Sequence, residues 1–370
     1  MYEKKLKIHN KSSKPTNVVA YEHGMIQECL EIEKLLPDYF YDFFLYLKGS
    51  VAVSTRLAYL NDIRFFLNYM INESNLSDAS SIGEIPMEHI IRITAKDVNR
   101  YLGGYCSRYL LEKGNQPIVM ENNNRSLSRK KSSLSVLFKF LYREEIMPGN
   151  ITDAFNPIKL PKPQPDAIKR LDIDEARIMF DCVASGKGLS DKEKLYWEKT
   201  KYSDMLILIL FTTYGLRLRE LQQLNVSSFN ISRGEFLVYR KRGKESAMPL
   251  NKSVERALKN YIEIERNGYS PKGEDALLLS MQKKRLTQRA IRDIVKKYTA
   301  IALGTTKENG YSPHKLRATA ATSLIEMGAS IYEVKNLLDH DNVTTTQLYS
   351  AHKKDQKREI IKKFEWLEDD

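Results

Sequence analysis

The stretch NPIKLPKPQP, residues 156–165, holds four prolines within nine residues. Proline lacks a backbone N–H and has a restricted φ, so this stretch cannot continue a helix and favours an extended, semi-rigid connector. A chain of 370 residues is also too long for one ordinary hydrophobic core. We therefore predict a proline-rich linker over residues 156–170, with one domain on each side of it.

The domain before the linker, residues 30–155, is predicted to be a small bundle of roughly four or five helices. Apolar residues recur there at helical spacing in two stripes, as on the core-facing side of a helix. The stripes are Leu60, Ile63, Leu67 and Met70, and then Leu134, Leu137, Phe138 and Leu141.

The domain after the linker, residues 171–355, mixes helices and strands. Asp172 and Glu175 have the spacing of a capping box and should open its first helix. The later elements expected are a buried helix over 205–224, strands over 235–240 and 246–250 around a polar turn at Gly243, and helices beyond residue 251. The predicted fold is therefore mainly α-helical, with a small antiparallel β-sheet in the C-terminal domain.

The net charge of +12, from 59 basic and 47 acidic side chains, favours a polyanionic partner. Nucleic acid is the first choice and an anionic membrane surface the second. The longest apolar run, residues 205–211, is far too short to span a bilayer, so we expect a soluble, cytoplasmic protein with no membrane partner. Residues 1–29 carry five lysines and are predicted to be a basic tail, either solvated or touching a nucleic-acid backbone.

The three cysteines, Cys29, Cys106 and Cys182, lie far apart and form no C-x-x-C pair. This spacing argues against a disulfide framework and against a zinc site. We predict three buried thiols and no bound metal.

Two segments of the second domain carry groups suited to an anion. In SPHKLR, residues 312–317, Ser312 can cap a helix and Pro313 can occupy its first position. His314 and Arg317 then share a face near the positive end of that helix. In TYGLRLREL, residues 213–221, Arg217 and Glu220 share a face, so the carboxylate can orient the guanidinium. Either segment alone would be an ordinary pair of charged residues on a helix.

The order of these segments resembles the tyrosine recombinases, also called phage-type integrases. The family pattern is T-G-x-R-x-x-E-L, a lysine on a β-turn, H-x-x-R, L-G-H and a final tyrosine. The matching positions here are YGLRLREL at 214–221, Lys241, HKLR at 314–317, LDH at 338–340, and Tyr349. In the first domain, Thr55, Tyr59, Asp62 and Phe66 look like the family's helical DNA-binding module. The resemblance covers most of residues 30–355.

The resemblance implies a covalent reaction at a DNA phosphodiester, without ATP, metal or other cofactor. Tyr349 would be the nucleophile, forming a 3′-phosphotyrosyl bond and releasing a 5′-hydroxyl. Lys241 would protonate the leaving oxygen, although Lys244 lies in the same turn and is the alternative. His314 would assist the proton of Tyr349 or hold the phosphate.

The remaining catalytic positions would bind the scissile phosphate. Arg217 and Arg317 would clamp it, because a guanidinium binds phosphate oxygens bidentately. His340 would donate a further hydrogen bond, and Glu220 would support Arg217. The family's glycine before this histidine is Asp339 here, which puts a carboxylate beside an anion site. It would weaken phosphate binding if it faced the phosphate, but we expect the side chain to point to solvent or to cap the next helix.

The same resemblance implies a two-domain clamp around double-stranded DNA. Residues 30–155 would be a core-binding (SAM-like) DNA-binding domain and residues 171–355 the catalytic domain. Arg129, Lys130 and Lys131 would contact phosphate, or would be a solvated helix end. Residues 356–370 would form a C-terminal helix that packs into a neighbouring subunit of a homotetramer, or onto its own domain.

The leading hypothesis is thus a Xer-like site-specific recombinase acting on DNA recombination sites. Integration or excision of a mobile element and resolution of chromosome dimers both remain open, as does an accessory DNA-bending or excisionase protein. The alternatives are a type IB topoisomerase-like enzyme, which would work as a monomer, and a DNA-binding protein that has lost catalysis.

Overall fold

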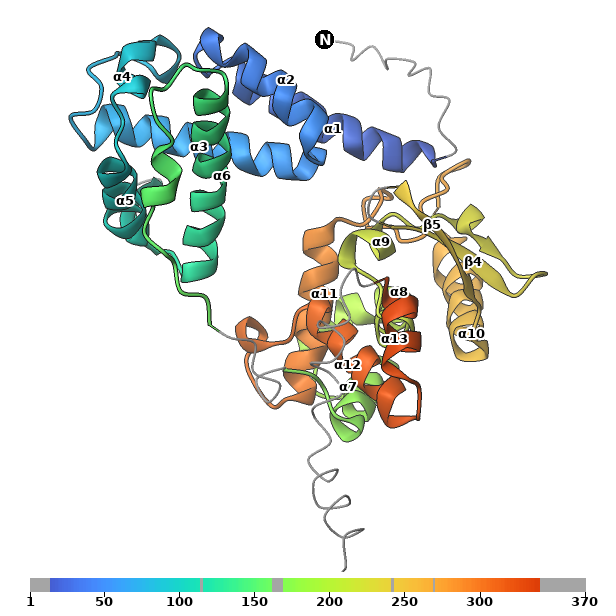
Figure 1. Cartoon of the computed structure of the whole chain (residues 1–370). Coiled ribbons are helices and arrows are strands. Elements are labelled where there is room, and N and C mark those ends of the chain that lie inside the picture. Colours follow the sequence, from blue (N-terminus) through green and yellow to red (C-terminus); the bar gives the residue numbers. More distant parts are fainter. Residues whose placement is uncertain (1–13, 114–115, 162–168, 241–242, 269, 340–370) are drawn as a thin grey trace, which may run out of the picture. The chain divides into compact units, whose positions relative to one another are not determined.

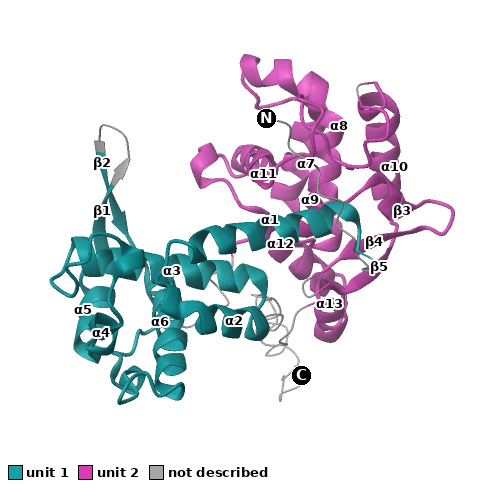
Figure 2. Ribbon diagram, turned by 90° about the horizontal axis from the view of Figure 1, so that it is seen from above, with its two compact units in different colours: residues 1–162 teal, residues 163–370 magenta. Residues whose placement is uncertain are grey.

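The computed structural model describes residues 14–113, 116–161, 169–240, 243–268 and 270–339. The chain divides into two compact units, residues 1–162 and 163–370 (Figure 2), and this division falls inside the predicted linker. Both units are mainly helical and each has a small antiparallel sheet, so the predicted fold class is confirmed. Within the described residues, no helix combines the length and apolar character that a membrane span requires.

Unit 1 is a helical bundle (Figure 1) with one β-hairpin, formed by the strands labelled β1 and β2 in Figure 2. Its elements are α1 (Thr16–Glu33), η1 (Asp38–Phe40), α2 (Tyr41–Ser50), α3 (Val53–Asn72), η2 (Ile82–Glu84), α4 (Met87–Ile91), α5 (Ala95–Gly103), η3 (Tyr105–Ser107), β1 (Arg108–Lys113), β2 (Gln116–Glu121), α6 (Asn124–Arg143) and η4 (Ile151–Ala154). Both predicted apolar stripes, one on α3 and one on α6, are buried in its core. The two helices pack against each other, as the stripes require.

The predicted N-terminal tail, residues 1–29, is too long, because a helix begins within it. Helix α1 begins at Thr16, so residues 16–29 are helical, and Val18, Val19 and Cys29 are buried. The helix packs against α3, and this burial stabilises a segment whose sequence has no helix-capping residue before it. Residues 1–13 of the predicted tail lie outside the described residues.

The hairpin of unit 1 was not predicted. Strands β1 and β2 pair antiparallel, from Arg108 opposite Glu121 to Lys113 opposite Gln116. The sequence does carry a signal for it, since Gly114-Asn115 separates two runs rich in branched and aromatic residues. Helical periodicity on both sides of this segment masked that signal.

Unit 2 surrounds a central helix. Its elements are α7 (Ile173–Ser185), α8 (Asp191–Tyr214), α9 (Leu218–Gln222), η6 (Val226–Ser228), β3 (Phe229–Asn230), β4 (Glu235–Tyr239), β5 (Glu245–Pro249), α10 (Lys252–Asn260), η8 (Tyr261–Arg266), α11 (Gln288–Ala302), η9 (Lys307–Asn309), α12 (Pro313–Glu326) and α13 (Ile331–Leu338). The three strands form one antiparallel sheet in the order β3-β4-β5, and β4 and β5 match the predicted pair. The predicted capping box of Asp172 and Glu175 is present at the start of α7.

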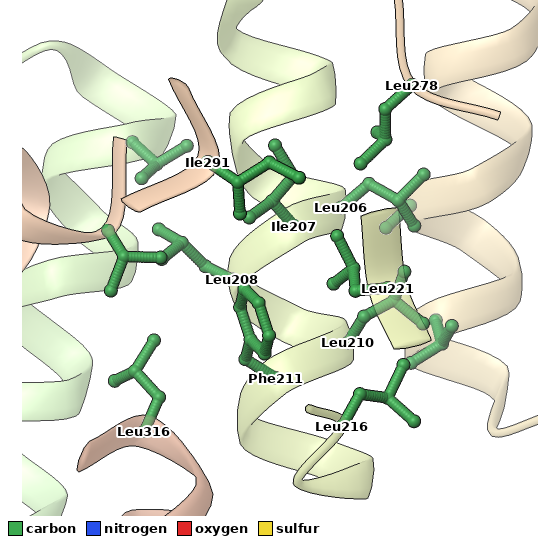
Figure 3. Packing of buried hydrophobic residues seen from close by; sticks show 14 of the residues in the cluster. Leu206, Ile207, Leu208, Leu210, Phe211, Leu216, Leu221, Leu278, Ile291 and Leu316 are labelled. Atoms are coloured by element: carbon green, nitrogen blue, oxygen red, sulfur yellow. The ribbon is translucent and has the colours of Figure 1, made fainter. Parts of the chain in front are cut away.

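Helix α8 is buried on nearly all sides at its C-terminal half. Helices α7, α10, α11 and α12 contact it, and Leu206, Ile207, Leu210 and Phe211 have no solvent exposure (Figure 3). Fully burying one such side chain contributes roughly 1.5–3 kcal/mol. The core therefore fixes the end of α8, where the chain turns toward the predicted arginine and glutamate.

The predicted helix over residues 205–224 is interrupted. Helix α8 ends at Tyr214, Gly215 takes the left-handed conformation with φ 57°, and the chain becomes helical again in α9. Glycine in this conformation ends a helix because it has no Cβ to clash with the following carbonyl. The three cysteines are buried and free, as predicted.

Candidate active site

The junction at Gly215 brings α8 and α9 into close contact with α12 and α13. A Cβ on Gly215 would lie 2.5 Å from Cδ2 of Leu338 and 3.4 Å from Cγ of Arg317. Both the positive φ and this close approach therefore require glycine. As a result, Arg217, at the N-terminal cap position of α9, faces segments more than 90 residues later in the chain.

Glu220 orients Arg217, as the sequence predicts. Its carboxylate accepts hydrogen bonds from the backbone N–H of Arg217 at 2.7 Å and from Nη1 of Arg217 at 2.8 Å. Glu220 is 4% exposed, whereas Arg217 is 36% exposed. The buried carboxylate thus holds one edge of the guanidinium while another part of it reaches the surface.

Arg317 is held by backbone carbonyls. Its residue exposure is 3%, and its Nη1 donates to the carbonyl of Gly215 at 2.6 Å while its Nη2 donates to the carbonyl of Leu338. A buried guanidinium without such acceptors would be very costly. Arg317 therefore links the junction at Gly215 to the end of α13.

The C-terminal end of α13 is the element that gathers the site. Three successive carbonyls each accept a hydrogen bond from an arginine: Leu337 from Arg240, Leu338 from Arg317, and Asp339 from Arg217. The last carbonyls of a helix have no partner within the helix and form its negative end, so they attract cations. The carbonyl hub, as we call these three acceptors, explains how arginine side chains from three separate segments come together at the end of α13.

Arg240 was missed in the sequence. It lies between β4 and the turn, is 5% exposed, and donates from Nη2 to Leu337 at 2.8 Å. Its Nε and Nη1 are buried and have no hydrogen-bond partner among the residues that the structure describes. The cluster of basic residues around Gly243 could have drawn attention to it, but no local pattern separates a buried arginine from an exposed one.

The prediction that the Asp339 side chain points to solvent was wrong. Its Oδ1 accepts a hydrogen bond from Nζ of Lys244 at 2.8 Å, and its Oδ2 lies 3.9 Å from Nη1 of Arg217. The other predicted role, capping the next helix, involves residues that lie outside the described part of the chain. The hydrogen bond from Lys244, and then the positive charges of Lys244, Arg240 and Arg217, hold the pKa of Asp339 below its ordinary value. The carboxylate is therefore ionised at neutral pH.

Asp339 also has an unusual backbone. Its φ of 51° and ψ of 54° lie in the left-handed region, which costs an L-residue roughly 1–2 kcal/mol and which glycine adopts freely. This left-handed backbone explains why the family pattern has glycine at this position. Here an aspartate occupies the same backbone conformation and adds an ion pair.

His314 stands on the first turn of α12, beside the two arginines. Partial burial, and then the positive charges of Lys315, Arg317 and Arg217, lower the pKa of His314. The imidazole is therefore neutral at pH 7.

A pocket of about 380 Å³ collects these groups. Its lining residues are Leu216, Arg217, Leu218, Arg292, Ser312, Pro313, His314 and Arg317. Ser312 stands at the cap position of α12, but its side chain makes no capping hydrogen bond, so that part of the prediction was wrong. Pro313 occupies the first turn as expected.

Four of the predicted site residues thus meet in one place: Arg217, Glu220, His314 and Arg317. Lys241, His340 and Tyr349 lie outside the described residues. In the described part of the chain, no group of three or more His, Cys, Asp or Glu side chains is arranged to hold a metal ion.

The three cations predicted to contact phosphate in unit 1 differ in their surroundings. Lys130 is 8% exposed, with Nζ 3.4 Å from the buried carboxylate of Asp62 and 4.3 Å from the ring centre of Phe65, so its ammonium group is held inside the fold. Arg129 also pairs with Asp62 but is 48% exposed at its side chain. Lys131 donates to the carbonyls of residues 155 and 156. Asp62 is buried, although no local sequence pattern indicates this, and its carboxylate pairs with two of the three cations, Arg129 and Lys130.

Replacing Gly215 with alanine should lower the free energy of unfolding by about 2 kcal/mol, because the new methyl group needs both the strained φ and a displaced Leu338. Urea unfolding followed by tryptophan fluorescence would measure this change, since Trp197 and Trp366 both lie in unit 2. Gly234→Ala is the control, because Gly234 has φ 64° and open space around its Cβ position. Equal losses in the two variants would show that the contact with Leu338 costs nothing.

Comparison with known proteins adds independent information. Residues 187–356 match the profile of the Phage integrase family. Tyrosine recombinase XerC of Natranaerobius thermophilus is 32% identical over 243 residues, which cover 64% of this chain and 75% of that protein. Tyrosine recombinase XerC of Oceanobacillus iheyensis is 28% identical over 323 residues, which cover 86% of this chain and 92% of that protein.

A solved structure with the same fold is that of the XerH site-specific recombinase bound to palindromic difH substrate, in a post-cleavage complex. It aligns with a TM-score of 0.60 and 18% sequence identity, covering 96% of this chain and 90% of that chain. The likeness extends over both units.

Proposed function

The chain belongs to the phage integrase family of tyrosine recombinases and is a tyrosine-type site-specific recombinase, and from this premise we propose that it cuts and rejoins DNA strands through a 3′-phosphotyrosyl intermediate. The observation that carries the proposal is the carbonyl hub, which holds Arg217 and Arg317 at one pocket. Two fixed guanidinium groups suit the two charged, non-bridging oxygens of a phosphodiester.

The two arginines would bind the scissile phosphate and stabilise the charge that grows on its oxygens. A guanidinium has five N–H donors, so the same group can be oriented by protein carbonyls and still bind a phosphate oxygen. Because Glu220 and the hub orient the donors before DNA arrives, little reorganisation is needed during the reaction. His340 would add a further hydrogen bond.

Three side chains transfer protons in the covalent step: those of Tyr349, His314 and Lys241. The phenol of Tyr349 passes its proton to neutral His314 as its oxygen bonds to phosphorus. The bond from phosphorus to the 5′-oxygen breaks, and that oxygen takes a proton from the ammonium group of Lys241. One phosphodiester replaces another, so the energy for rejoining is retained.

The rate constant for cleavage at subsaturating DNA should fall on acidification only at a lower pH than an unperturbed histidine would require, because His314 must be neutral to accept a proton and its pKa is lowered. The pH profile of covalent-complex formation would measure this. The fall should disappear in His314→Gln, which leaves only a slow, pH-independent rate. A rate that rises on acidification would mean instead that protonated His314 holds the phosphate.

Lys241 is the better candidate for the general acid. The ammonium group of Lys244 is already held by the carboxylate of Asp339 at 2.8 Å. Proton donation from Lys244 would leave that carboxylate without its partner. The ion pair therefore supports a role for Lys244 other than proton donation.

Unit 1 would bind the duplex, and the two units together would form a clamp on cytoplasmic DNA. Arg129 and Lys131 remain candidates for phosphate contact, with Lys139 lining the same side of α6 as Lys131. Strand exchange between two sites needs four protomers, and the apolar spacing of Ile360, Phe364 and Leu367 suits a helix that docks on a neighbour. Integration, excision and dimer resolution are all served by this chemistry, with or without an accessory DNA-bending or excisionase protein.

The test is a covalent trap. Sheared genomic DNA from the source organism is incubated with the full chain, and DNA that stays attached to protein in SDS is sequenced to map the cleavage site. A nicked duplex spanning that site should then form a covalent complex with the wild-type chain and none with Tyr349→Phe. No complex with the wild type, or one that survives the substitution, would contradict the proposal.

A second assay separates the alternatives. A recombinase should exchange strands between two copies of the site, whereas a topoisomerase-like enzyme should relax supercoiled DNA as a monomer. A DNA-binding protein without catalysis should do neither.

A further inference from the structure

The turn between β4 and β5 is fastened to the end of α13 on both of its sides. Before the turn, Arg240 donates to the carbonyl of Leu337 at 2.8 Å, and after it Lys244 donates to the carboxylate of Asp339 at 2.8 Å. The backbone N–H of Arg240 also donates to the carbonyl of Lys244 at 2.7 Å, which closes the turn. The residues between these anchors include Lys241.

A carboxylate is unexpected at the position of Asp339. Asp339 adopts a left-handed backbone that glycine would occupy without strain, and it places a negative charge 3.9 Å from Nη1 of Arg217. The strained backbone costs stability, and the negative charge opposes binding of a phosphate at Arg217, so we expect the side chain to have a compensating role. With respect to the described residues, a glycine here would lose the ion pair with Lys244 and the longer contact with Arg217.

We propose that Asp339 and Lys244 are positioning residues of this recombinase, and that their ion pair holds the β4–β5 turn against the carbonyl hub so that the proton donor carried by the turn meets the leaving 5′-oxygen. The inference rests on the proposed function and assigns a task to a residue at which this chain departs from its family. It also separates the two lysines of the turn: one donates the proton and the other anchors the turn.

A sulfur atom at the bridging 5′ position isolates this role. A thiolate is a good leaving group without protonation, so a 5′-thio substrate needs no general acid but still needs the two arginines and the tyrosine. A variant that only misplaces the acid should therefore be slow on the oxygen substrate and normal on the sulfur substrate. A variant that disturbs Arg217 should be slow on both.

The experiment measures single-turnover cleavage of matched nicked duplexes with a 5′-oxygen or a 5′-sulfur. Asp339→Gly and Lys244→Ala should each cleave the oxygen substrate about tenfold more slowly and the sulfur substrate within about twofold of wild type. The double variant should be no slower than about tenfold, because both changes break the same ion pair. Asp339→Asn should lie closer to wild type, since asparagine tolerates the same backbone and can still accept a hydrogen bond from Lys244.

Two reference variants make the outcome specific. Glu145→Gly also replaces an acidic residue of positive φ, at 59°, but lies in unit 1 and should change neither rate. Lys241→Ala should lose cleavage of the oxygen substrate and keep cleavage of the sulfur substrate. If the wild type or Lys241→Ala fails these expectations, the proposed function is at fault and not the ion pair.

Two results would overturn the positioning role while leaving the proposed function intact. In the first, Asp339→Gly cleaves the oxygen substrate as fast as wild type or faster, which would make the carboxylate a mere stand-in for the phosphate. In the second, Asp339→Gly slows both substrates equally, which would place its effect on Arg217.

Discussion

Replacing Arg217 with alanine is expected to slow DNA cleavage by about 10³-fold, because a preoriented donor to the transition-state phosphate is lost. The orientation is visible in the structure, where Glu220 and the carbonyl of Asp339 hold opposite parts of the guanidinium at 2.8 Å each. The measurement is the single-turnover rate of covalent-complex formation on the nicked duplex. Duplex affinity at fixed salt should change little, because most of it comes from dispersed phosphate contacts.

Arg217→Lys is the matched control for charge. Lysine keeps the positive charge but lacks the planar fork that spans Glu220 and the hub, so its rate should fall between those of wild type and Arg217→Ala. A lysine variant with full activity would show that charge alone suffices. An alanine variant with near-normal cleavage would remove Arg217 from the catalytic set.

Replacing Arg317 with alanine should have two large effects. Cleavage should again fall by about 10³-fold, and the free energy of unfolding should fall by about 3 kcal/mol. The second effect follows from burial, since the carbonyls of Gly215 and Leu338 would lose a charged donor in a site that is 3% exposed at Arg317. Cleavage and urea unfolding of the same preparation measure both.

Arg170→Ala is the stability control for this variant. Arg170 forms an ion pair with Glu326, which lies on α12 as Arg317 does. This pair is partly exposed, with 3.3 Å between the charged atoms. Such a pair contributes about 0–1 kcal/mol, so little stability should be lost. If Arg317→Ala were no less stable than Arg170→Ala, the hub would not depend on its buried arginine.

Local patterns in the sequence anticipated the elements that depend on periodicity. The stripes of α3 and α6, the capping box of α7 and the β4–β5 pair all follow from residue spacing within a few turns of chain, and all are present. The errors lie where a distant partner decides. Helix α1 begins well before the predicted boundary because α3 covers it, and Lys130 is buried because Asp62 recruits it.

The candidate site divides in the same way. The order and chemical identity of Arg217, Glu220, His314 and Arg317 could be anticipated from the sequence because, together with the later segments, they follow the family pattern; the spacing within either pair alone is ordinary. The role of Asp339 could not, since its partner Lys244 is 95 residues away and neither residue carries a local signal of the pairing.

The chain's linear order of residues thus determined which chemical groups are available and on which kind of element each one lies. Only the tertiary structure decided that three consecutive carbonyls at the end of α13 would collect three arginines from α12, from the cap of α9 and from the edge of β4. The physical reason is that periodicity encodes burial along one element, whereas the acceptors at a helix end are backbone atoms, the same for every sequence, and packing alone chooses which cations reach them.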